Sequence, residues 1–196
     1  MTLQEVKIAG QEDENAIIDV LKLAFAGDPV SRWIWPSPQK YLSSVEDFAR
    51  AYGGKAFSNK TAYFVGDYSG AALWLPNGVE PDFDTMMAIL QATSSKEAQT
   101  DGPEVFEKMG GFHPTEPHWY LPLLGVDPFY HGKGLGTALM GYATDIFDKE
   151  NIVAYLESSN EKNITLYKRH GFESLGIVQV NTSPTIYPMM RKPRTR

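Results

Sequence analysis

The segment from residue 123 to residue 139 constrains the fold of this chain more than any other. An apolar run from Leu123 to Val126 leads into a turn with glycines at positions 132, 134 and 136, and the spacing predicts a helix over Lys133–Lys149. A strand, a glycine-rich turn and a helix in this order bring backbone N–H groups and the positive helix end together. The segment therefore predicts an α/β fold with an anion-binding loop, or else only an ordinary strand-to-helix turn.

Hydrophobic periodicity along the rest of the chain alternates between strands and helices. Strands are predicted at residues 6–9, 61–65, 71–75, 118–126, 152–157, 172–180 and 186–190, and helices at 12–25, 41–57 and 160–170. Some strands are joined by a hairpin and others by a helix, which favours a mixed sheet with helices on both faces. Pro122 donates no ladder hydrogen bond, so it indicates an edge, a bulge or a separated strand pair.

The chain length of 196 residues is that of one domain, so residues 1–196 are assigned to a single unit. Within this unit, residues 77–117 are polar, rich in methionine and glycine, and only weakly periodic. We expect them to form one or two helices that serve as an inserted lid or acceptor lobe. An aromatic loop is expected around Trp33 and Trp35, after the turn at residues 27–29.

Composition excludes several classes of function. The absence of cysteine excludes disulfides, thiolate metal sites and a protein thiol nucleophile. The 18 Lys and Arg against 24 Asp and Glu give a net charge of −6, which argues against a nucleic-acid partner and favours a cationic small molecule. The first residues lack the features of a leader, and no window is apolar enough to span a membrane. We therefore expect a soluble, cytoplasmic protein with no membrane partner.

Other interpretations of the glycine-rich loop fit its residues less well. A Walker loop needs Ser or Thr directly after Gly-Lys, where this chain has Gly134. The dinucleotide fingerprint lacks its third glycine, although Glu157 follows near the place of the ribose-binding acid, so an NAD-binding oxidoreductase stays open as an alternative. The four histidines show no paired ligand spacing, so no metal is predicted. A Gly-x-Ser-x-Gly nucleophile elbow is also missing from the sequence.

Two motifs, in order along the chain, resemble the GNAT superfamily of N-acetyltransferases. Residues 131–136, His-Gly-Lys-Gly-Leu-Gly, are similar to its Gln/Arg-x-x-Gly-x-Gly/Ala acetyl-CoA loop, with His131 where Gln or Arg is usual. Residues 156–159, 163–167 and 171–172 resemble its last motif. Over residues 118–172 and 190–193 the likeness is to puromycin N-acetyltransferase-like members. The resemblance implies a twisted, mostly antiparallel sheet of six to seven strands, with helices on both faces and a splayed strand pair that takes the cofactor.

The same resemblance implies acetyl-CoA-dependent transfer of an acetyl group to a primary amine of a small molecule, by direct attack in a ternary complex. Tyr167 is then the expected acid for the leaving thiolate, since tyrosine stays protonated at pH 7, and Glu157 is the expected base for the amine. Asn163, four residues before Tyr167, shares its helix face and is expected to hold the cofactor's amide arm. The implied cofactor-binding residues are Leu124, Gly125, Val126, His131, Gly132, Lys133, Gly134, Leu135, Gly136, Thr137, Asn163 and Tyr167.

The acceptor pocket is expected at aromatic and charged side chains outside these motifs. The candidates are Asp28, Trp33, Trp35, His118 and Tyr120, which can pair with or stack on a cationic or aromatic amine. The tryptophans can equally belong to the core, and His118 is a second candidate for the base. A non-catalytic acyl-CoA-binding regulatory module would carry the same motifs. The identity of the acceptor stays open, and the apolar content is compatible with a homodimer.

Overall fold

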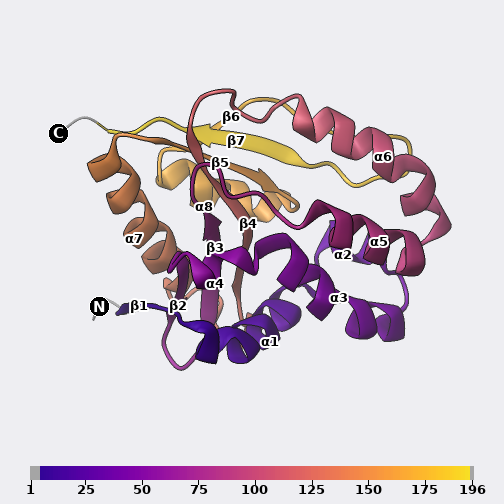
Figure 1. Ribbon diagram of the computed structural model, residues 1–196, viewed down its shortest axis with the longest axis horizontal. Helices are drawn as coiled ribbons and strands as arrows, with labels where there is room; N and C mark the ends of the chain where they lie inside the picture. Colours follow the sequence, from indigo (N-terminus) through magenta and orange to yellow (C-terminus); the bar gives the residue numbers. More distant parts are fainter. Residues whose placement is uncertain (1–4, 195–196) are drawn as a thin grey trace.

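The computed structural model describes residues 5–194, so the first four residues, on which the expected absence of a leader partly rests, lie outside the described residues. Within this range seven strands form one sheet in the order β1-β2-β3-β4-β5-β7-β6 (Figure 1). Their bounds are β1 Val6–Ile8, β2 Ala62–Val65, β3 Gly70–Leu75, β4 His118–Val126, β5 Val153–Ser158, β6 Glu173–Ser174 and β7 Tyr187–Arg191. Only β4 and β5 run parallel. The predicted mixed, mostly antiparallel sheet is confirmed.

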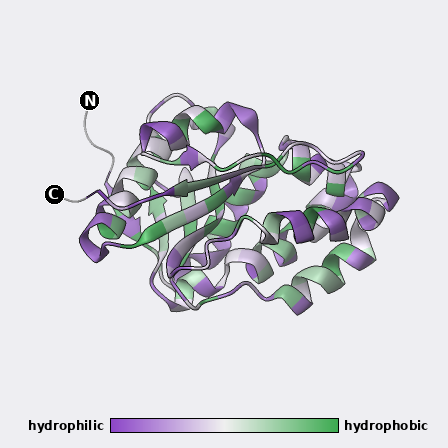
Figure 2. Ribbon diagram, turned by 90° about the horizontal axis from the view of Figure 1, so that it is seen from above, coloured by the Kyte–Doolittle hydropathy of each residue, from purple (hydrophilic) through white to green (hydrophobic). Residues whose placement is uncertain are grey.

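Helices cover both faces of this sheet, as predicted. The helices are α1 Glu14–Phe25, α2 Pro29–Ile34, α3 Pro38–Gly53, α4 Lys55–Ser58, α5 Phe83–Thr93, α6 Lys96–Gly110, α7 Leu135–Glu150 and α8 Ile164–Arg169. Short 3-10 turns precede α1, α7 and α8 at residues 11–13, 128–130 and 161–163. Figure 2 shows both hydrophilic and hydrophobic residues along the helices, as expected for helices that lie between a core and solvent.

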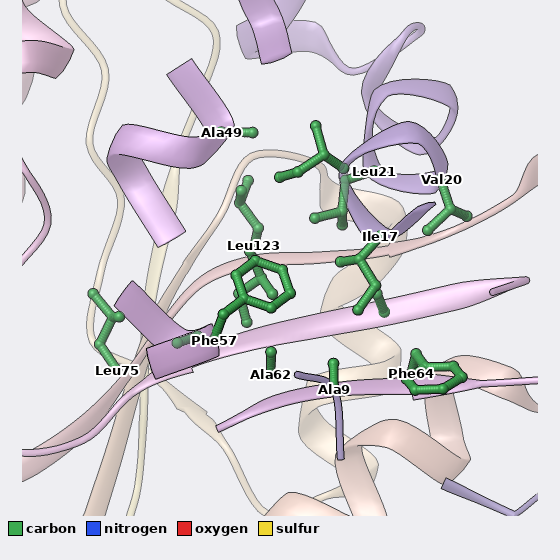
Figure 3. Close-up of a cluster of buried hydrophobic side chains, with 14 of the residues drawn as sticks. Ala9, Ile17, Val20, Leu21, Ala49, Phe57, Ala62, Phe64, Leu75 and Leu123 are labelled. Carbon is green, nitrogen blue, oxygen red and sulfur yellow. The ribbon is translucent and has the colours of Figure 1, made fainter. Parts of the chain in front are cut away.

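Two cores fill the space between the helices and the two faces of the sheet. On one face, Ile17 and Leu21 of α1 and Phe57 of α4 pack against strand residues such as Phe64 and Leu123 (Figure 3). On the other face, α7 and α8 contribute a second cluster that includes Leu139, Phe147 and Tyr167, together with Trp74, Trp119, Leu121 and Leu156 from the strands. The central strands, β3 and β4, therefore contribute side chains to both cores.

A β-bulge at Pro122 changes which face the side chains of β4 occupy. Leu73 of β3 lies opposite Leu123, whereas Leu75 lies opposite Tyr120, so β4 carries one extra residue over this interval. Leu121, before the bulge, belongs to the core under α7, while Leu123, after it, belongs to the core under α1. The bulge therefore re-aims the second half of β4, as the proline suggested.

Two segments differ from their predicted structure, and in a third the structure defines the helices that were expected. Part of the aromatic loop predicted around Trp33 and Trp35 is the short helix α2, because Pro29 occupies its first turn and Asp28 caps it with hydrogen bonds to the N–H groups of Val30 and Ser31. The predicted strand over 172–180 pairs only at 173–174, and beyond Gly176, whose φ is +155°, only the Val178–Ile186 bridge remains. Residues 77–117 contain two helices, α5 and α6.

Candidate active site

Strands β4 and β5 pair over only half of their length. His118 to Leu121 align with Val153 to Leu156, and the pairing stops at the bulge. Beyond that point β4 stays bonded to β3, and β5 stays bonded to β7 up to Ser158, so one backbone edge of each strand faces the gap between them. The predicted splayed strand pair is therefore present, and its free N–H and C=O groups can take an extended chain of amide-bearing ligand.

The glycine-rich loop after β4 begins helix α7 without a side-chain cap. Gly132 and Gly134 have φ of +75° and +83°, a region that favours glycine, and Gly134 occupies the N-cap position. The N–H groups of residues 135–137 lie in the first turn and have no intrahelical partner, and within residues 5–194 no side chain of the N-cap residue bonds to them. Leu135 is buried and fixes the start of the helix in the core. The loop therefore offers uncapped donors at the positive end of a 16-residue helix.

The remaining predicted loop residues have structural contacts of their own. The Nε2 atom of His131 lies 3.0 Å from the carbonyl oxygen of Val126, so this exposed ring ties the loop back to β4. The ammonium of Lys133 lies 4.6 Å from the centre of the Tyr130 ring. A side chain at Gly125 would place its Cβ 2.6 Å from that of Ala24, so α1 approaches the β4 backbone here too closely for any residue but glycine.

Tyr167 presents an unpaired hydroxyl in a buried position. The residue is 6% exposed on α8, and within the described part of the chain its hydroxyl makes no hydrogen bond. Burial, and secondly the charge of Asp28, raise the pKa of Tyr167 above its ordinary value. The phenol is therefore protonated at neutral pH and can donate a proton. Asn163, at the junction of the preceding turn with α8, is exposed and lines the same cavity.

Glu157 is a buried carboxylate near the end of β5. Its side chain is 3% exposed, and its Oε2 atom accepts a hydrogen bond of 2.8 Å from the Tyr120 hydroxyl, which itself contacts the Tyr52 hydroxyl. The Nε2 atom of His113 lies 2.9 Å from the other oxygen, Oε1, but outside hydrogen-bond geometry, so Oε1 has no donor among residues 5–194. Burial, followed by the charge of Glu157, raises the pKa of Tyr120, which keeps that phenol protonated. One oxygen of the carboxylate thus accepts a hydrogen bond, and the other is open only in the sense that it accepts none from the described residues.

A cavity of about 150 Å³ lies where β4 and β5 separate, and it brings together both predicted catalytic residues and part of the remaining predicted site. Its walls come from α1, α2, α3, α5, α6 and α8 and from the two strands. The predicted site residues that line it are Leu124, Asp28, Trp33, Trp35, Glu157, Asn163 and Tyr167. His118 and Tyr120 line a second, smaller hollow with His113 and residues 75–80 instead. The structure thus divides the five expected acceptor residues between two hollows.

The three acceptor candidates in the main cavity also serve the fold. The Oδ1 atom of Asp28 caps α2, and its Oδ2 atom accepts a bond of 2.5 Å from the Ser159 hydroxyl. Burial raises the pKa of Asp28, and these hydrogen bonds oppose that rise. Trp35 is 1% exposed and donates its indole N–H to Thr93, while Trp33 is half-buried and donates to Thr182.

A network of hydrogen bonds fixes the wall formed by α6. Asp101 of α6 accepts three hydrogen bonds, at 3.0, 3.1 and 2.7 Å, from Asn181 and from the backbone and side chain of Thr182. Thr182 in turn accepts the indole N–H of Trp33 at 3.1 Å. Sequence reasoning missed this network, and it also missed Tyr52 and His113 next to Glu157, because each contact joins segments more than 35 residues apart. Ser159 alone carried a signal, since it lies within the second motif.

Comparison with known proteins agrees with this geometry. Residues 98–172 match the acetyltransferase (GNAT) family. An uncharacterised N-acetyltransferase of Schizosaccharomyces pombe is 28% identical over 148 residues, which cover 67% of this chain and 59% of that protein. A Corynebacterium glutamicum structure described as histone acetyltransferase HPA2 and related acetyltransferase is 25% identical, with a TM-score of 0.69, over 100% of this chain and 99% of that one.

The segment from residue 98 to residue 172 is therefore similar to the GNAT acetyltransferase family, which the two sequence motifs also resemble. A further GNAT-like fold, the Thermoplasma acidophilum PaiA N-acetyltransferase solved in complex with coenzyme A, has a TM-score of 0.56 at 14% identity, covering 96% of this chain and 98% of that one. The S. pombe relative is matched over less than two thirds of its own length. The GNAT match begins in α6 and contains β4, the loop, β5 and α8, whereas α1, α2, α3 and α5 lie outside it. Among the described residues no helix is long and apolar enough to cross a membrane.

Proposed function

We propose that the chain is an acetyl-CoA-dependent N-acetyltransferase that acetylates a primary amine of a small molecule by direct attack in a ternary complex. One observation carries this proposal: Glu157, with an open carboxylate oxygen, and Tyr167, with a free hydroxyl, line the same cavity at the splay of β4 and β5. A base for the amine and an acid for the leaving group are thereby available on two walls of one space.

The residues around the splay fit coenzyme A. The uncapped first turn of α7, with Gly132 and Gly134 in left-handed conformations, fits a pyrophosphate, and the free strand edges fit the amide-bearing arm. The bound cofactor supplies an acetyl group activated as a thioester. We assign its binding to the residues that the motif implied, namely Leu124, Gly125, Val126, His131, Gly132, Lys133, Gly134, Leu135, Gly136, Thr137, Asn163 and Tyr167.

Two side chains of this protein then move protons. Glu157 takes the proton that the amine nitrogen loses as the nitrogen–carbon bond forms, and Oε1 is the oxygen that accepts no hydrogen bond from the described residues. Tyr167 gives its proton to the sulfur as the carbon–sulfur bond breaks, and its raised pKa keeps that proton in place beforehand. His113, 31% exposed and 2.9 Å from Oε1, lies between Glu157 and the second hollow, on the side from which solvent can reach the carboxylate.

The Tyr167→Phe variant tests the enzyme against a non-catalytic acyl-CoA-binding module. We expect kcat to fall about 100-fold, while the Kd for acetyl-CoA from calorimetry changes less than about threefold, since only a proton donor is lost. Release of free thiol across a panel of primary amines is the assay. Tight acetyl-CoA binding without thiol release from any amine would support the binding module, and binding of NAD(H) without acetyl-CoA would revive the oxidoreductase.

Several finer assignments also belong to this proposal. We assign residues 77–117, with α5 and α6, to an acceptor lobe because both helices line the cavity. A small-molecule acceptor, rather than a protein, is supported by the enclosure of the cavity among six helices, although the C. glutamicum neighbour is described by the name of a histone acetyltransferase. The puromycin-type resemblance, a cytoplasmic location and a homodimer stay predictions from the sequence.

A further inference from the structure

The cavity wall beyond Glu157 and Tyr167 is mostly apolar. Six half-buried side chains line it from α1, α2, α3 and α6, and several of them are large and aromatic. They are Phe25, Trp33, Ile34, Phe48, Phe106 and Met109. Side chains of this kind favour an apolar partner and provide no hydrogen bonds to a polar one, apart from the indole N–H of Trp33, which is already bonded to Thr182.

The described lining contains three charged side chains, and two of them already have ion-pair or hydrogen-bond partners within the protein. The ammonium of Lys22 lies 3.4 Å from the carboxylate of Asp19 and 3.3 Å from that of Glu46. Neither of these two acidic residues belongs to the cavity lining. Both oxygens of Asp28 accept hydrogen bonds from α2 and Ser159. Glu157 therefore supplies the one open carboxylate oxygen in the described lining.

The hydroxyl groups in the lining are mostly engaged as well. Ser94 donates to the carbonyl of Leu90, Ser158 donates to that of Asn160, and Ser159 donates to Asp28. The Tyr52 hydroxyl contacts that of Tyr120. The side-chain amide of Asn163 also lines the cavity and is assigned above to the cofactor. A second charged or strongly polar group on an acceptor would therefore find few unengaged partners in the described lining, and burying such a group unpaired is costly.

We infer that the acceptor is a primary monoamine whose single substituent is uncharged and apolar, either aromatic or aliphatic. This inference rests on the proposed acetyl transfer and names its substrate class. The nitrogen lies at Glu157 and the substituent packs against the apolar wall. Polyamines and aminoglycosides would bury an unpaired second ammonium, and amino acids would bring a carboxylate towards Asp28 and Glu157. Polyamines, aminoglycosides and amino acids are therefore disfavoured as acceptors.

Pairs of amines that differ by one group test the inference on the unaltered protein. Hexylamine is compared with 1,6-diaminohexane, and 2-phenylethylamine with phenylalanine, by kcat/KM from thiol release at saturating acetyl-CoA. The monoamine of each pair should be favoured at least about tenfold, the effect of burying one unpaired polar group. Equal or higher kcat/KM for the diamine or the amino acid would overturn the inference while leaving acetyl transfer intact.

A failure of the proposed acetyl transfer can be distinguished from a failure of the monoamine inference. If no amine in the panel releases thiol, acetyl transfer itself fails. Calorimetry with the same pairs then still tests the cavity, because hexylamine should bind at least about tenfold more tightly than 1,6-diaminohexane. Equal binding, or tighter binding of the diamine, would overturn the assignment of the cavity to monoamines.

A charge placed in the wall tests where the substituent lies. Met109→Glu adds a carboxylate at the α6 wall and should lower the hexylamine-to-diamine preference at least about tenfold, because the second ammonium gains a partner. Met87→Glu, on a side chain of α5 that is 42% exposed, is the matched control and should leave the preference unchanged. An unchanged preference in a Met109→Glu protein with a cooperative thermal transition would contradict this placement, and the amine pairs decide the substrate class if that variant fails to fold.

Discussion

The two halves of the proposed site, one for the cofactor and one for the acceptor, are built in different ways. The cofactor half, formed by the second part of β4, the loop to α7 and helix α8, relies on backbone groups within one stretch of about 50 residues. The acceptor half is a wall of side chains from α1, α2, α3, α5 and α6, which lie far apart in the sequence. Backbone recognition leaves glycines at fixed positions in a sequence, whereas a side-chain wall leaves little beyond general apolar character.

Glu157 lies where the two halves meet, so its loss should have the largest effect. In Glu157→Gln the amide oxygen can still accept the Tyr120 hydrogen bond, but the base is gone, and kcat should fall about 10²- to 10³-fold. Both KM values should change less than about threefold. Steady-state kinetics with hexylamine measures this, and Glu173→Gln, an exposed residue of β6, is the control. A fall of less than about threefold in kcat would transfer the role of base to another group, with His118 next.

Much of the proposed cofactor half could be predicted because its residues lie close together in the sequence. The loop at 131–136 and the pair Asn163 and Tyr167 could be proposed from the sequence because each lies within one short motif. Pro122 indicated a bulge or a separated pair, and the structure contains both, since the register shift and the end of β4–β5 pairing coincide there. The proline alone did not show that the side chains after it change faces.

The acceptor half could not be predicted to the same depth. The helix α2 escaped prediction because its six residues are too few to show a period, although Asp28 and Pro29 are typical of a helix start. Tyr52, on α3, touches Tyr120 across 68 residues of chain, and no local pattern records such a contact. Asp28 and Trp35 were expected in the acceptor pocket, and the structure shows that both also stabilise the fold through hydrogen bonds of their own.

Gly134→Ala should affect the cofactor half alone. A side chain at φ +83° costs about 1–2 kcal/mol, so the loop either becomes strained or moves, and the KM for acetyl-CoA should rise about tenfold. The KM for the amine should change less than about twofold, because no acceptor contact involves this backbone. Gly27→Ala is the control, since Gly27 has open space around it and no positive φ. A matching rise in both KM values would show that the two halves are not independent.

Asp101→Ala should affect the acceptor half alone. It removes one hydrogen bond from Asn181 and two from Thr182, which in turn holds Trp33, so the KM for the amine should rise about threefold to tenfold with no change in the KM for acetyl-CoA. Glu104→Ala, on an exposed carboxylate of the same helix, is the control. An altered acetyl-CoA KM would indicate that the wall and the loop move together.

The same variant has a defined pH dependence. Hydrogen bonds from Thr182 and Asn181 hold the pKa of Asp101 below its ordinary value. Because the folded pKa is the lower one, the stabilisation is complete above about pH 4 and is lost as the pH falls through the folded pKa. The difference in melting temperature between the native protein and Asp101→Ala should therefore be full at pH 7 and shrink below pH 4.

His131→Gln should have the smallest effect of the series. The variant restores a residue usual at this position in the family and exchanges one exposed side-chain bond to the Val126 carbonyl for another. The KM for acetyl-CoA should change less than about threefold at pH 8. A tenfold change at pH 8 would mean that side chains, and not only backbone, hold the cofactor.

The hydrogen bond between Ser159 and Asp28 links the two halves at a single point, joining the end of β5 to the start of α2. A ligand in one half that shifts α2 or the end of β5 must lengthen this bond, and a bond of this kind contributes about 0.5–1.5 kcal/mol. Communication between the sites through it is therefore limited to about tenfold in affinity, and it acts equally in both directions. Acetyl-CoA and amine are accordingly expected to bind in either order, each altering the dissociation constant of the other by no more than that factor.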